Sequence, residues 1–179
     1  MSVLLSTPRA AKEAAGPEGG PLPLLLACHV RIRSFSALSL KLLEAGGAPA
    51  EQVRGAATSV LRYFTEALPR HSDDEELSLA PRLVGWVRGA ALAEMAEQHL
   101  QMEALVDELA GMWLTLAEAP EELAALEGPL RAPTERLAAL WEPHLAVEER
   151  DLFPTLEQLA PTVRAQIWTE MRARRGLAP

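Results

Sequence analysis

All four histidines of this chain and two of its glutamates recur with a spacing that could bind metal. His71 and His144 open two similar stretches, "HSDDEELSLAPRL" at 71–83 and "HLAVEERDLFPTL" at 144–156. The two stretches share the pattern H-x-x-x-E-E-x-x-L-x-P-x-L. In each, a glutamate (Glu75 or Glu148) follows the histidine by four residues. On a helix this spacing puts both side chains on one face, with about 5–6 Å between their Cβ atoms.

The other two histidines, His29 and His99, lie on apolar stripes of their own predicted helices. Burying an unpartnered polar group costs roughly 2–7 kcal/mol, so six such groups need a common explanation. A network of Glu–His hydrogen bonds is one alternative. A metal centre is the other, because coordination offsets the desolvation of imidazole and carboxylate. One zinc ion would use only four ligands. Four nitrogens and two carboxylates suit two ions bridged by the carboxylates, and the absence of thiolate favours iron or manganese.

The apolar spacing predicts the helices that carry these residues. Leu92, Met95, His99, Met102, Val106, Leu109, Trp113 and Leu116 follow one another in steps of three or four, which makes one helical stripe. Together with the Pro and Gly punctuation, such stripes predict long helices at about 21–45, 49–79, 87–118 and 121–159, and a short fifth helix at 161–174. We expect Pro81 to end the second helix, and "GP" at 128–129 and Pro133 to interrupt the fourth. The predicted fold is all-α, an up-down-up-down four-helix bundle.

The sequence resembles the hemerythrin-like (HHE cation-binding) family from about 22 to 175. The family pattern H…HxxxE…H…HxxxE is matched by His29, "HSDDE" at 71–75, His99 and "HLAVE" at 144–148, and the tail "EERDLFPTL" is also similar. The resemblance implies a non-heme di-iron centre, for which manganese or zinc could substitute. It also implies that His29 and His71 hold one iron, His99 and His144 hold the other, and Glu75 and Glu148 bridge them.

Two departures from the oxygen-carrying members point to the bacterial six-ligand type. The oxygen carriers have a second histidine one turn after that of the third helix, and this chain has Glu103 there. Glu103 is therefore kept as a candidate seventh ligand, against the alternative that it faces solvent. The oxygen carriers also place their last carboxylate five residues after the final histidine. Here that position is Glu149, while Glu148 sits at four. Glu76 and Glu149 are predicted to be solvated or to support the ligands indirectly.

The composition argues against several classes of protein: nucleic-acid-binding, disulfide-stabilised and membrane-spanning proteins. The net charge of −8 argues against a broad nucleic-acid surface, and the "RARR" run at 172–175 is interpreted as cations at a helix C-terminus. The one cysteine, Cys28, excludes a disulfide framework. There is no signal peptide pattern and no apolar run long enough to span a membrane. We expect a loose arm at 1–20, a bundle domain at 21–179 and a cytoplasmic monomer or homodimer.

The expected partner is a small diatomic molecule, O2 or NO, or peroxide. The resemblance leaves several functions open: binding or sensing in the response to oxidative or nitrosative stress, a peroxidase-like or catalase-like enzyme, storage or donation of iron for the repair of iron centres, and a bundle without metal. Whether the protein is an enzyme stays open, since a shared fold does not determine the reaction.

Overall fold

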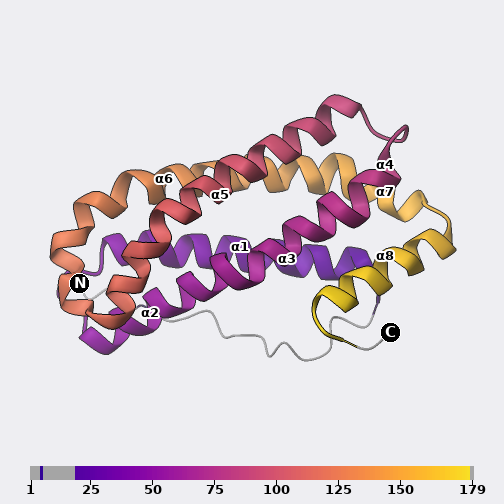
Figure 1. Ribbon diagram of the computed structural model, residues 1–179. Helices are drawn as coiled ribbons and strands as arrows, with labels where there is room; N and C mark the ends of the chain where they lie inside the picture. The colour runs from indigo at the N-terminus through magenta and orange to yellow at the C-terminus, as the bar shows by residue number, and fades with distance from the viewer. Residues whose placement is uncertain (1–4, 6–18, 178–179) are drawn as a thin grey trace.

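In the computed structural model, residue 5 and residues 19–177 are described, and they form four long helical rods (Figure 1). The first rod is α1 (Pro21–Leu43). The second is continuous and consists of α2 (Ala50–Arg62), η1 (Tyr63–Ala67), α3 (Leu68–Asp73), η2 (Asp74–Leu79) and α4 (Ala80–Leu83). The third is α5 (Gly89–Glu118), which the 3-10 turn η3 (Pro120–Glu122) follows. The fourth consists of α6 (Leu123–Val147), η4 (Glu148–Leu152) and α7 (Phe153–Gln158), and a fifth helix, α8 (Pro161–Arg174), comes last.

The rods close a ring, since α1 and α5 each pack against both α2 and α6. Successive rods run in opposite directions, and α8 folds back onto the end of the bundle where α1 begins (Figure 1). The predicted all-α bundle with a short C-terminal helix is therefore confirmed, and the fifth helix has the predicted bounds. None of the helices in the described part of the chain is long and apolar enough to cross a membrane.

The predicted roles of several prolines were wrong. Pro81 does not end the second rod, which continues to Leu83. Pro129 and Pro133 both lie inside α6 without interrupting it. In the second and fourth rods the wide π-helical segments η1, η2 and η4 each end two residues before a proline: Pro69, Pro81 and Pro154. A proline has no N–H and clashes with the carbonyl four residues back. A π turn, which spaces its bonds one residue further apart, lets the rod continue past it.

The core has an apolar layer at each end and a polar layer between them. One apolar cluster includes Ile32, Phe64, Met102 and Trp141, and the other includes Leu25, Leu79, Met95 and Phe153. Along every rod the histidine falls between residues of the two clusters. The apolar layers therefore fix the rods on both sides of the polar residues, which holds those residues at one level of the bundle.

Phe64 is expected to be one of the most costly core residues to truncate. It is 1% exposed, and its ring stacks against Trp113 and Trp141 with centroid distances of 5.5 and 6.3 Å. Phe64→Ala should lower the free energy of unfolding by about 3–5 kcal/mol, because it leaves a cavity between two fixed indoles. Urea denaturation of the metal-free protein measures this. Leu114→Ala, at a site 47% exposed, is the control and should change it by less than about 0.5 kcal/mol. Equal losses would contradict the packing described.

Most of the predicted arm at 1–20 lies outside the described residues, which include only residues 5, 19 and 20 of it. The arm and the domain boundary at residue 21 therefore stay predictions.

Candidate metal centre

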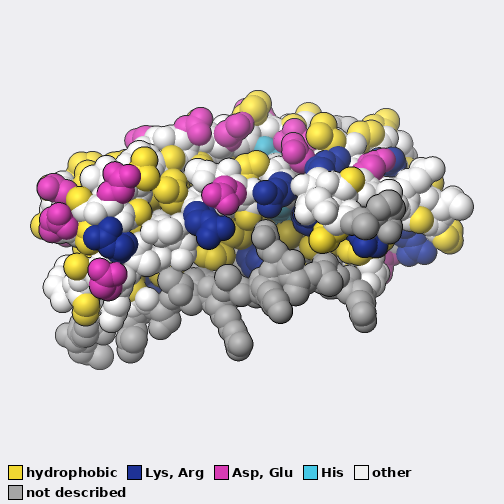
Figure 2. Space-filling model, turned by 60° about the horizontal axis from the view of Figure 1, so that its bottom comes forward, with side chains coloured by type: hydrophobic (Ala, Val, Ile, Leu, Met, Phe, Trp, Pro, Cys, Tyr) yellow, Lys and Arg dark blue, Asp and Glu magenta, His cyan; other side chains and the backbone are white. Residues whose placement is uncertain are grey.

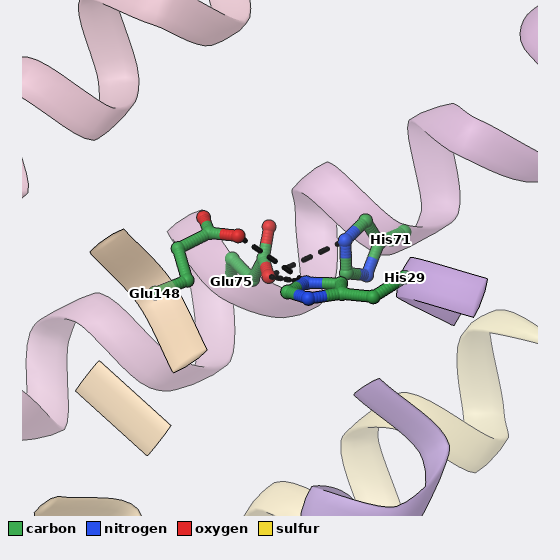
Figure 3. Close-up of side chains that lie close together, drawn as sticks. All are labelled: His29, His71, Glu75 and Glu148. Atoms are coloured by element: carbon green, nitrogen blue, oxygen red, sulfur yellow. Dashed lines mark ion pairs between the residues drawn. The ribbon is translucent and has the colours of Figure 1, made fainter. Parts of the chain in front are cut away.

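Six polar side chains from all four rods meet in the middle layer of the bundle. Each is buried, with at most 7% of its surface exposed, and they are His29, His71, Glu75, His99, His144 and Glu148. Figure 3 shows His29 and His71 turned toward the carboxylate ends of Glu75 and Glu148. Histidine contributes only small areas to the molecular face seen in Figure 2.

The first ligand group is formed by His29, His71, Glu75 and Glu148. His29 Nε2 lies 3.3 Å from Glu148 Oε2 and 3.8 Å from Glu75 Oε1. His71 Nε2 lies 3.4 Å from the same Glu75 oxygen. One candidate ligand atom from each of the four residues falls within 4.8 Å of the others. Two imidazole nitrogens and two carboxylate oxygens thus surround a common point.

The second group is formed by His99, His144, Glu75 and Glu148. The two Nε2 atoms, of His99 and His144, are 3.1 Å apart. His144 Nε2 lies 3.2 Å from Glu148 Oε1, and His99 Nε2 lies 3.5 Å from Glu75 Oε2.

Each glutamate divides its two oxygens between the groups. Glu75 turns Oε1 toward His29 and His71 and Oε2 toward His99. Glu148 turns Oε2 toward His29 and Oε1 toward His99 and His144. A carboxylate placed in this way can bind one ion through each oxygen. The arrangement therefore offers two cation positions with shared carboxylates.

Many polar atoms at this centre have no hydrogen-bond partner. They include the Nε2 atoms of His29 and His71 and both carboxylate oxygens of Glu75 and of Glu148. Buried polar groups are almost always satisfied, so each unpaired one needs an explanation. A divalent cation would satisfy these atoms together, and His–carboxylate sets without thiolate suit iron. The donor set therefore fits a pair of cations.

Burial and the neighbouring charges shift the pKa values of the candidate ligands. Burial, with the neighbouring Glu148, raises the pKa of Glu75 well above its usual value. Burial lowers the pKa of His144 to about 4 and that of His71 well below its usual value. For His29 burial acts in the same direction, but the nearby carboxylates of Glu148 and Glu75 outweigh it and raise the pKa to about 10. Metal binding requires neutral imidazole, which His71 and His144 already provide at neutral pH.

Three of the four histidines have a hydrogen-bond acceptor at Nδ1, which leaves Nε2 facing the centre. The Nδ1–H of His29 donates to Glu149 (2.8 Å), that of His99 to Glu76 (2.7 Å) and that of His144 to Gln98 (2.8 Å). Such partners fix the ring and raise its basicity toward a metal. Glu76 and Glu149 thus have the indirect supporting role allowed for them, whereas Gln98 was missed because only the fold brings it beside His144.

The structure does not bring Glu103 to the centre. It is exposed and belongs to neither ligand group. Met102, one residue earlier, occupies the buried position that follows His99 on α5 and is 1% exposed. Tyr63 also stays away from the ligands: its ring stacks on Phe35 at 4.1 Å, and its hydroxyl donates to the Cys28 carbonyl at 3.4 Å. These contacts give Tyr63 a packing role.

Arg33 has two acidic partners, Glu142 and Glu149, and we expect only Glu149 to affect metal binding. Arg33 binds Glu149 (2.8 Å) and Glu142 (2.9 Å), but only Glu149 touches His29, and the hydrogen bond from Arg33 lowers the pKa of Glu149. Glu149→Ala should weaken metal binding about 10–100-fold, because His29 loses its acceptor. Competition with a chromogenic chelator measures this. Glu142→Ala is the matched control, and the prediction fails if both variants bind metal alike.

A comparison with known families agrees with this geometry. The family model of the hemerythrin HHE cation-binding domain matches residues 20–156, well over half of the chain. The chain belongs to this family. A relative of this hemerythrin-like protein is an uncharacterized protein of Haemophilus influenzae, 32% identical over 104 residues, which are 49% of this chain and 60% of the relative. The chain thus covers less than two thirds of that relative's length. No solved structure matches this sequence.

Proposed function

We propose that this hemerythrin-like protein holds two iron ions and binds a small ligand, O2, NO or peroxide, at them. One observation carries the proposal: two groups of four candidate ligands share Glu75 and Glu148. Each of these glutamates turns one carboxylate oxygen toward the first group and the other oxygen toward the second. His29 and His71 would hold one ion, and His99 and His144 the other. When bound, iron supplies redox chemistry and positions that the protein leaves open.

The closure of the site supports a small ligand. None of the six side chains is more than 7% exposed, so a bulky substrate has no direct access to them. Phe153 lies over His29 with a ring-centroid distance of 4.9 Å, and Trp141 lies 5.9 Å from His144. These rings cover parts of the two histidines with apolar surface. Ligands so closely enclosed favour a molecule as small as a diatomic gas or peroxide.

Burial also bears on the choice among the functions that the sequence leaves open. A protein that donates iron must release it, and ligands buried between two apolar layers favour retention instead. We therefore place ligand binding, as in a response to oxidative or nitrosative stress, before iron donation. Turnover of peroxide would use the same site and differs from binding only in the reaction of the bound ligand.

Spectroscopic titration of the iron-loaded protein tests the proposal. Azide, NO and O2 should each change the visible absorption in a saturable way, and His99→Ala should abolish the change. A saturable spectrum without loss of the added ligand supports binding or sensing. Continuous release of O2 from added peroxide, measured with an oxygen electrode, supports a catalase-like enzyme instead. Iron-loaded protein whose spectrum responds to none of these ligands would contradict the proposal.

A further inference from the structure

Asp74 is a buried charge that does not face the metal centre. It is fully buried in η2, directly before Glu75. Its two oxygens meet the C-terminal helix instead: Oδ1 lies 2.8 Å from Arg174 Nη1, and Oδ2 lies 2.6 Å from Arg175 Nη2. A buried carboxylate is tolerated when charged groups pair with it. The two arginines at the end of α8 therefore fix the direction of the Asp74 side chain.

Further contacts attach the same short segment to α8. Arg174 Nη2 donates to the Ser78 hydroxyl at 2.8 Å, and that hydroxyl donates to Glu170 Oε2 at 2.6 Å. Arg82, one turn after Ser78, donates to Glu170 Oε1 at 2.6 Å. Six charged or polar side chains thus connect η2 and α4 to α8 and the residue that follows it, and Figure 1 shows α8 against this end of the bundle.

The second H-x-x-x-E motif has no equivalent of this network. Its residue that corresponds to Asp74 is Val147, and the one that corresponds to Ser78 is Asp151. Asp151 pairs with its own neighbour, Arg150, at 2.7 Å. The network is therefore not a general requirement of a helix that carries such a motif. It belongs to the motif that α8 covers.

We propose that α8 positions Glu75 for metal binding, with Arg174 and Arg175 as positioning residues. Successive side chains on a helix point in different directions, roughly a quarter of a turn apart. When Asp74 is fixed toward α8, Glu75 is therefore fixed toward the two ligand groups. The inference rests on the proposed metal centre.

Arg174→Gln in the full chain tests the inference, with Arg172→Gln as the matched control. Arg172 lies on the same helix and stacks over Trp168, with 5.9 Å to the ring centroid. We expect Arg174→Gln to weaken Fe²⁺ binding about 10–100-fold in anaerobic chelator competition, the range seen for supporting residues of metal sites. The visible spectrum of the Co²⁺-loaded variant should also change, since Co²⁺ absorption reports coordination geometry. Arg172→Gln should retain the affinity and spectrum of the natural protein.

Asp74→Asn provides a second variant that keeps the side-chain shape and leaves no buried carboxylate unpaired. It should also weaken Fe²⁺ binding, and the Asp74→Asn/Arg174→Gln double variant should bind no more weakly than the weaker single variant. Loss of stability in either variant with unchanged affinity and unchanged Co²⁺ spectrum would overturn the inference and leave α8 a structural role. If the natural protein and Arg172→Gln both fail to bind metal, the proposed function itself is wrong.

Discussion

Glu75→Gln is expected to remove metal binding at both positions, whereas His71→Ala should remove it at one. Glu75 gives an oxygen to each ligand group, while His71 belongs to one group alone. A glutamine keeps the volume of the side chain but loses the charge, so neither cation retains its full set of carboxylates. Elemental analysis of the purified variants should find iron near zero for Glu75→Gln and about half the natural content for His71→Ala.

In the metal-free protein, Glu75→Gln should increase the stability of the fold. There Glu75 and Glu148 are two buried carboxylates whose oxygens have no hydrogen-bond partner. Because burial disfavours the charged form of Glu75, Glu75→Gln removes the cost of burying or protonating that carboxylate and should raise the free energy of unfolding by about 1–3 kcal/mol. If these residues instead formed a structural Glu–His network, Glu75→Gln would lower that free energy. Glu103→Gln is the matched control, because Glu103 is exposed and outside both ligand groups. It should change neither the iron content nor the free energy of unfolding.

Metal should also be a major source of stability for the natural protein. A ligand that binds only the folded state stabilises it by about 2.7 kcal/mol at a concentration 100 times its Kd. For a chain of this size, each kcal/mol raises Tm by about 2–4 °C. Each bound ion should thus raise Tm by about 5–11 °C under those conditions. Calorimetry of the protein with added Fe²⁺ under anaerobic conditions, and with a chelator, measures the difference.

Variants determine whether this stabilisation arises at the proposed centre. His144→Ala should lose about half of the metal-dependent rise in Tm, since His144 is 1% exposed and belongs to the second ligand group alone. Gln101→Ala, on the exposed face of α5, should keep the full rise. A full rise in His144→Ala would show that the cations bind elsewhere.

The candidate ligands could be predicted from the sequence because periodicity places them. Each histidine falls on the apolar stripe of its helix, and Glu75 and Glu148 follow by four residues. Helical spacing therefore directs all six to the inside of any bundle of these helices. Glu103 became a candidate through the resemblance instead, since it stands where the oxygen carriers have a second histidine. The apolar stripe ran through Met102, and the structure accordingly buries Met102 and leaves Glu103 exposed.

Features that depend on several rods could not be predicted in this way. The acceptor of His144 is Gln98 on another rod, and nothing in the local sequence marks it. The π segments η2 and η4, in which Glu75 and Glu148 lie, were also missed, and Pro81 was interpreted locally as the end of a helix. The run at 172–175 was interpreted as helix-terminal cations, although Arg174 and Arg175 bind Asp74, about 100 residues away.

The metal content of the natural protein tests the central claim most directly. Protein purified after growth in iron-rich medium, or loaded anaerobically with Fe²⁺, should contain about two irons per chain by elemental analysis. His71→Ala should reduce that number to about one. A metal content near zero in the natural protein, together with unchanged stability of His71→Ala, would contradict a di-metal centre.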